Sequence, residues 1–182
     1  MAKSGSNWRT IVLVVVLFIS FVMFGFGLAI YGNTLTKWWI PVVPALTFAA
    51  VTTPLFVKRW RGLTESRSSI YNAACHIFTA FSVAYFLFLG CNYFFADDST
   101  LVVEKTEVVK KYSKTHTRYR RVSRNRRVPD GHYFTYHILL RFSDGREKEQ
   151  EVKLQSYNRI RTGSTRDVKV ENGLFGLAVI KH

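Results

Sequence analysis

The chain has 182 residues, 48% of them apolar, a formal net charge of +14 and two cysteines. These averages would fit a basic globular protein, but the first 96 residues hold seven Lys or Arg and one acid, Glu65, whereas the last 86 hold nineteen basic residues and eleven acids. Cys75 and Cys91 lie in one apolar run, about 24 Å apart along a helix, which excludes a disulfide between them.

Residues 1–98 are predicted to form a three-span membrane anchor, with spans at about 10–36, 38–57 and 68–96. The three runs contain 27, 20 and 29 residues without Asp, Glu, Lys or Arg, and about 20 apolar residues cross a 30 Å hydrocarbon core. The first run is far longer than the core of about 7–15 residues in a cleavable signal peptide. Pro54 predicts a kink or an end in the second helix. A re-entrant second segment is the alternative.

The loop at 58–67 predicts the orientation of the anchor. It carries four basic residues and one acid, and loops rich in Lys and Arg stay in the cytoplasm. The N-terminus, with Lys3 and Arg9, is then inside, and the Lys37 loop and the C-terminal domain are outside. The net charge of that domain does not oppose this orientation, because long domains are translocated largely regardless of charge.

Span three carries a polar stripe at helical spacing. The stripe consists of Asn72, Cys75, Thr79 and Ser82, with His76 beside it. Small and hydroxyl-bearing side chains let membrane helices pack closely, so helix packing is the favoured interpretation. The alternative is a polar pathway with His76 handling protons, as in a small transporter or channel component. The spans contain no Asp, Glu, Lys or Arg that would relay a proton.

Residues 99–182 are predicted to form a small all-β soluble domain, an antiparallel sandwich or open barrel. Residues 101–112 are rich in Val and Thr and predict its first strand. The segment 134–142 alternates apolar and polar residues with a period of two, which predicts a strand with one buried face. The turn Ser143-Asp144-Gly145 follows, with Gly145 at the positive-φ position of a three-residue loop. The chain then returns as a strand over 146–155, and 156–166 is predicted to be a loop.

This loop length predicts a register between the two strands. On the buried face it sets Tyr136 opposite Val152 and Phe134 opposite Leu154; on the other face it sets Arg141 opposite Glu147 and His137 opposite Glu151. A second hairpin is predicted at Asn172-Gly173, a strong two-residue turn signal. There Val170 would face Phe175, and Val168 would face Leu177.

The segment from Phe134 to Ile180 resembles a bacterial family of small membrane-anchored proteins of unknown function. The resemblance covers about a quarter of the chain, and its motifs are Tyr136 to Phe142, Asp144-Gly145, Gly163, Val168-Lys169-Val170 and Gly176-Leu177-Ala178. It implies a C-terminal extracytoplasmic β-domain, but it implies no catalytic residues. The membrane is then expected to be the bacterial cytoplasmic (inner) membrane.

The stretch 110–127 is the most unusual part of the domain, because it is dense in cations without a single acid, and Val128-Pro129-Asp130-Gly131 follows it as a turn signal. We expect a basic hairpin whose candidate binding residues are Lys110, Lys111, Lys114, Arg118, Arg120, Arg121, Arg124, Arg126 and Arg127, with Tyr112 and Tyr119. Membrane lipids or an envelope protein with an acidic surface are the expected partners. A solvated, flexible arm is the alternative interpretation.

The sequence shows no signature of an enzyme. It contains no phosphate-binding glycine loop, no Gly-x-Ser-x-Gly motif and no cysteine–histidine spacing typical of a metal site. The acids Glu147, Glu149 and Glu151 share one strand face, where a charge-paired surface is favoured over a catalytic dyad. We therefore expect no cofactor and no metal, and a binding or accessory subunit of an envelope assembly, compatible with a homo-oligomer. A cytoplasmic nucleic-acid binder, which needs the opposite orientation, is the alternative.

Overall fold

A computed structural model describes residues 4–181. The chain divides into two compact units: one runs to Leu101 and also includes Glu171–Ile180, and the other is Val102–Val170 together with Lys181. The C-terminal segment 171–180 therefore belongs with the helices, although the sequence predicts it as part of the β-domain.

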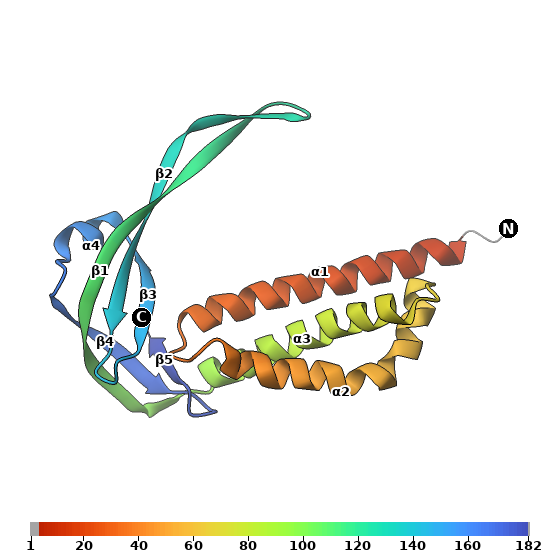
Figure 1. Ribbon diagram of the computed structural model, residues 1–182, viewed down its shortest axis with the longest axis horizontal. Helices are drawn as coiled ribbons and strands as arrows, with labels where there is room; N and C mark the ends of the chain where they lie inside the picture. Colours follow the sequence, from red (N-terminus) through yellow and green to blue (C-terminus); the bar gives the residue numbers. More distant parts are fainter. Residues whose placement is uncertain (1–3, 182) are drawn as a thin grey trace. The chain divides into compact units, whose positions relative to one another are not determined.

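The first unit contains the three predicted helices, α1 (Ser4–Gly32), α2 (Trp39–Thr64) and α3 (Ser69–Phe94). Each is long and apolar enough to cross a membrane, and Figure 1 shows them lying side by side. Their packing depends on a small residue: a Cβ added to Gly27 would lie 2.8 Å from the Tyr85 ring. The buried centre is formed by Ala45, Tyr85 and Leu89.

Helix α2 runs seven residues beyond the predicted end at Val57. Pro54 lies inside it, and Figure 1 shows α2 bending toward its C-terminal end, as expected where a proline removes a backbone hydrogen bond. The helix stops at Glu65, whose φ of 56° is left-handed. Helix α3 then begins at Ser69, and Ser68 caps its N-terminus, because the Ser68 hydroxyl accepts a hydrogen bond from the Tyr71 N–H at 3.3 Å. The predicted basic loop is therefore mostly helix.

The strands form one five-stranded antiparallel sheet in the order β3-β2-β1-β4-β5, which confirms three helices followed by a small β-domain. The strands are β1 (Asp97–Ser123), β2 (Arg126–Arg141), β3 (Glu147–Val152), β4 (Thr165–Asn172) and β5 (Ala178–Lys181). Strand β1 begins earlier and ends later than the predicted 101–112. A short helix, α4 (Leu154–Arg159), replaces the start of the loop predicted at 156–166.

The predicted register between β2 and β3 is largely confirmed. Tyr136 faces Val152, His137 faces Glu151 and Arg141 faces Glu147, and Gly145 has the expected positive φ of 82°. The pairing of Phe134 with Leu154 is wrong, because β3 ends at Val152 and Leu154 begins α4. The predicted inner face is buried from Ile138 onward, whereas Phe134 is 52% exposed.

The predicted two-residue hairpin at Asn172-Gly173 is wrong. The Gly173 N–H donates to the Leu177 carbonyl at 3.0 Å, so the loop is three residues long, and its last residue, Gly176, has a positive φ of 72°. Phe175 and Leu177 lie before the start of β5 at Ala178, and the predicted pairs with Val170 and Val168 do not form.

The segment 173–177, which contains this loop, is held by the end of α3. The buried Asn92 side chain donates to the Leu177 carbonyl and accepts from the Phe175 N–H, both at 3.0 Å. Phe175 also stacks on Phe88, with ring centroids 4.7 Å apart. Gly173 must be a glycine, because an added Cβ would lie 2.2 Å from the Asn92 amide nitrogen.

The connection between α1 and α2 also contacts the C-terminal segment 171–180. The Leu35 N–H donates to the Ala178 carbonyl at 2.8 Å, and the Ile180 N–H donates to the Asn33 carbonyl at 2.7 Å; Thr34 and Val179 form an antiparallel bridge. At the other end of the helices, Arg9 pairs with Glu65 at 3.2 Å. The segment 171–180 and the N-terminal part of α1 thus lie at opposite ends of the helical bundle.

Candidate binding arm

Strands β1 and β2 continue as a two-stranded ribbon beyond their neighbours. Strand β3 pairs with β2 only as far as Tyr136, and hydrogen bonds on the β4 side of β1 reach Val108, whose N–H donates to the Ser164 carbonyl at 2.9 Å. Within the described residues, 113–135 form a ribbon in which the two strands pair with each other alone. We call this ribbon the arm; Figure 1 shows it projecting from the sheet.

The tip of the arm differs from the predicted turn. The chain reverses at Arg124 and Asn125, between Ser123 and Arg126. The turn signal Pro129-Asp130-Gly131 lies inside β2 as a bulge, because two β2 residues oppose Arg118 between the pairs Thr117–His132 and Tyr119–Pro129. Gly131 supplies the positive φ, 88°, that such a bulge requires.

Four of the nine candidate cations have partners within the protein. Lys111 lies over the Tyr157 ring at 4.2 Å and donates to the Ile160 carbonyl at 3.0 Å. Lys110 and Lys114 both lie 5.5 Å from the centre of the Tyr112 ring, and Lys114 also pairs with Glu149 at 2.8 Å. The fourth, Arg121, donates to the carbonyl oxygens of Ser123 and Arg124 at 3.1 and 2.6 Å and so fastens the turn.

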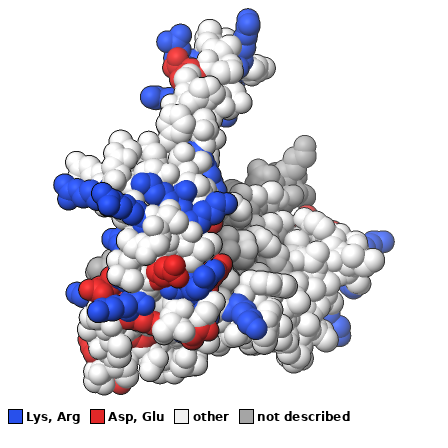
Figure 2. Space-filling view, turned by 60° about the vertical axis from the view of Figure 1, so that its left-hand side comes forward, with Lys and Arg blue, Asp and Glu red and all other residues white. Residues whose placement is uncertain are grey.

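The other five cations are arginines near the end of the arm. Among the described residues, no hydrogen bond, ion pair or ring contact engages the side chains of Arg118, Arg120, Arg124, Arg126 and Arg127. Two large apolar or aromatic side chains lie between them, Tyr119 at 61% exposed and Val122 at 57%. Figure 2 shows Lys and Arg side chains near the tip of the arm with acidic atoms beside them, a mostly uncharged shaft, and basic and acidic side chains on the sheet below. The arm therefore ends in unpaired positive charge beside exposed apolar surface.

A hydrogen-bonded cluster that the sequence does not predict lies at the base of the arm. His137 Nδ1 lies 2.9 Å from Glu149 Oε1, and His137 Nε2 lies 2.9 Å from Thr135 Oγ1. His116 Nε2 reaches the same hydroxyl at 3.0 Å. The hydrogen bonds from the Lys114 ammonium and then the Tyr112 hydroxyl lower the pKa of Glu149 below its usual value.

The alternation in 134–142 had already placed His137 on the outer face, but its partner is the diagonal Glu149 and not the directly opposite Glu151. The carboxylate, imidazole and hydroxyl in a row resemble a catalytic relay. Here, however, the hydroxyl is shared by two histidines, and the carboxylate by Lys114, a histidine and a phenol, so these side chains form a set of cross-strand contacts at the base of the arm.

The polar stripe of α3 is mostly buried within the helical unit. Asn72, Cys75 and Ser82 are buried. The Asn72 amide donates to the Ser66 carbonyl at 2.9 Å and accepts from Thr64 Oγ1, and Ser82 Oγ donates to the Phe78 carbonyl at 2.7 Å. Thr79 is the exception: its buried hydroxyl has no partner among the described residues.

His76 is satisfied as a neutral ring. The Trp60 indole N–H, which can only donate, lies 3.1 Å from Nδ1, so Nδ1 must accept and the proton must be on Nε2. Nε2 then donates to Thr52 Oγ1 at 2.9 Å, because that hydroxyl donates to the Phe48 carbonyl. The ring also stacks on Phe56 at 5.2 Å. These contacts connect α2 to α3 and weigh against a proton pathway through His76.

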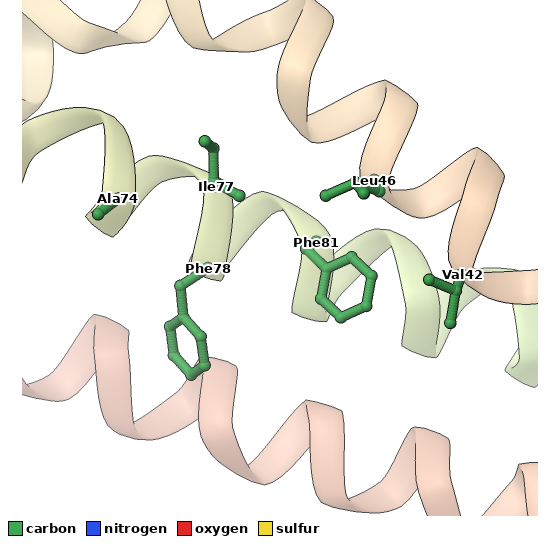
Figure 3. Close-up of a pocket in the computed structure, with 6 residues that line it drawn as sticks. All are labelled: Val42, Leu46, Ala74, Ile77, Phe78 and Phe81. Atoms are coloured by element: carbon green, nitrogen blue, oxygen red, sulfur yellow. The ribbon is translucent and has the colours of Figure 1, made fainter. Parts of the chain in front are cut away.

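An apolar groove of about 540 Å³ lies between α2 and α3. Figure 3 shows the six side chains that line it, Val42, Leu46, Ala74, Ile77, Phe78 and Phe81. Acyl chains would fill such a groove in a bilayer, and none of its lining residues has a polar side chain that would select a ligand.

Comparison with protein-family models, with curated proteins and with solved structures finds no match to this chain. The resemblance of the segment 134–180 to a bacterial membrane-anchored family therefore stays a prediction. Among the described residues, no group of three His, Cys, Asp or Glu side chains lies close enough to hold a metal ion.

Proposed function

We propose that this membrane protein is a non-enzymatic accessory subunit of a bacterial envelope assembly, and that its arm binds an acidic surface of a membrane or envelope protein. The observation that carries the proposal is the set of five arginines without partners at the end of the arm. Unpaired guanidinium groups beside exposed aromatic surface are typical of binding sites for acidic partners, because Arg forms bidentate hydrogen bonds with carboxylates.

We further propose that the arm lies outside the cytoplasmic membrane. Arg9 and the basic segment 58–67 lie at one end of the helical bundle, as their contact through Glu65 indicates, and basic ends of membrane helices favour the cytoplasm. The segment 171–180 lies at the opposite end.

The orientation is tested by fusing a phosphatase that is active only outside the cytoplasm, and separately a fluorescent protein that folds only inside, to the C-terminus. Phosphatase activity without fluorescence supports the proposal. Fluorescence without phosphatase activity contradicts it and would make nucleic acid the first ligand to test.

The role of the arm is tested by photo-cross-linking in living cells, with the cross-linker placed at the exposed Val122. We expect one defined envelope protein to be captured, and capture to be lost when the five arginines are replaced by serine. Replacement of the same five by lysine, which keeps the charge, should retain most of the capture. A cross-link to lipid alone, or capture that survives the serine variant, would refute binding to an acidic protein surface.

A further inference from the structure

One face of the arm carries a continuous row of cations and rings along β1. Alternate residues of a strand point to the same side, and β1 has no extra residue between Lys110 and Arg120, because the bulge in this stretch lies on β2. Six consecutive positions on this face are therefore Lys110, Tyr112, Lys114, His116, Arg118 and Arg120. The positions of the Lys110 and Lys114 ammonium groups over the one ring of Tyr112 agree with this assignment.

Strand β2 completes the row with rings. Tyr112 stacks on His137 with centroids 5.5 Å apart, and His116 stacks on Tyr133 at 5.0 Å, both with ring planes 17° apart. Cations and ring pairs thus alternate from Lys110 to Arg118, and Arg120 follows as a second consecutive cation. Neighbouring positions in the row are about 6.7 Å apart, and the six positions extend over about 33 Å.

The opposite face of β1 differs in charge. Its lower end is covered, because Lys111 there packs on Tyr157, and the positions that follow along the arm are the uncharged Ser113, Thr115 and Thr117. Apart from Lys111, the cations of β1 from Lys110 to Arg120 therefore lie in one line on one face, and one of them, Lys114, is paired with Glu149.

We propose that this row binds a linear polymer that carries phosphate groups at regular intervals. This inference goes beyond the proposed function: it assigns a second ligand to one face of the arm and does not depend on capture of an acidic protein. A chain of evenly spaced anions can engage the cations of a one-residue-wide row in sequence, whereas a flat or globular acidic surface would meet the tip of the ribbon from either face. Phosphate is the expected anion, because the unpaired Arg118 and Arg120 have the planar donor fork that matches phosphate oxygens.

The test uses the full chain in neutral detergent micelles and inorganic polyphosphate of about 60 units as the probe. Orthophosphate is the monomer comparison, and polyglutamate of similar length is the carboxylate comparison. We expect polyphosphate to bind, orthophosphate not to bind measurably, and polyglutamate to bind more weakly. We expect Arg118→Ser with Arg120→Ser to weaken polyphosphate binding by about 30-fold, the equivalent of about 1 kcal/mol for each cation.

A second pair of substitutions tests whether binding depends on the positions of the cations in the row or only on the net charge of the arm. Arg124→Ser with Arg127→Ser also removes two unpaired arginines, one from the turn and one from the face that carries Arg121. The row pair should weaken binding at least five times more than this tip pair, with both variants melting at the wild-type temperature.

The proposal that the row binds a phosphate polymer would be refuted if the two pairs of substitutions weakened binding equally. It would also be refuted if polyglutamate bound as tightly as polyphosphate. Neither result would contradict the capture of an acidic protein by the arm. Loss of that capture in cells with polyphosphate binding retained would instead contradict the proposed function and leave the row standing.

Discussion

Removal of the Asn92 side chain should release the C-terminal segment from the helices. In Asn92→Ala the Phe175 N–H loses its partner, whereas the Leu177 carbonyl loses one of two donors and keeps the Gly173 N–H. A buried polar group left without a hydrogen bond costs about 1–3 kcal/mol if water does not replace the amide. Even the lower value would increase local opening of the segment 171–180 about 5-fold.

Gly173→Ala should have a similar effect for a different reason. Gly173 is not among the glycines with positive φ, so alanine suits its backbone, but the new Cβ would lie 2.2–2.4 Å from three atoms of the Asn92 side chain. Asn92 must then move and lose the same two hydrogen bonds. In the double variant this clash is absent, and we expect the second substitution to add little to the first.

The assay is hydrogen exchange of the amides of residues 174–180 in the full chain, in micelles, compared with amides of β2. Each single variant should speed exchange in the segment by about 5-fold or more, and the double variant should exchange no faster than Asn92→Ala. Additive effects of the two substitutions, or unchanged exchange in Asn92→Ala, would refute the assignment of Asn92 as the residue that holds the loop.

Two further predictions concern the helix packing and the base of the arm. Gly27→Ala should destabilise the helical bundle by about 1–3 kcal/mol in a detergent unfolding titration, because its Cβ would press on the Tyr85 ring, whereas Gly25→Ala, with nothing within 4 Å, should have little effect; equal effects would contradict the close approach. The pKa of Glu149 is lowered, chiefly by Lys114, so its contribution to stability is complete above the ordinary glutamate pKa and is lost as the pH falls through the folded-state value. The melting temperatures of wild type and Glu149→Gln should therefore differ at pH 7 and converge as the pH falls below the folded-state pKa of Glu149, and a constant difference would contradict this ion pair.

The sequence predicts the parts of this structure that depend on local pattern. The uncharged runs predict the three helices, and the alternation from Tyr136 to Phe142 with the Gly145 loop predicts the register with β3. The failures come from tertiary contacts. Asn172-Gly173 signals a two-residue turn, but Asn92, which is 85 residues from Leu177 in the chain, holds a longer loop in place.

The candidate binding residues show the same division. The density of Lys and Arg in 110–127 marks the arm in the sequence, yet only the structure separates Lys111 and Arg121, which hold the fold, from the five arginines without partners. Pro129-Asp130-Gly131 fits a turn or a bulge equally well, and the register of the surrounding strands decides between them. The contact of the His137 ring with the Glu149 carboxylate runs diagonally across the ladder, which a face-by-face pattern does not reveal.

The contact between the segment 171–180 and the helices has a consequence for the order in which the protein assembles. Translation delivers the three helices first and the residues of the β-domain next, and the segment that pairs with Thr34 and Asn92 is made only after residues 102–170. Contacts between residues so far apart in the chain form late and slowly. The Asn92 side chain therefore cannot form its hydrogen bonds to Phe175 and Leu177 until the β-domain has been synthesised. In the proposed orientation, the β-domain must also have been translocated by then. Docking of this segment would then mark the moment at which both units are complete.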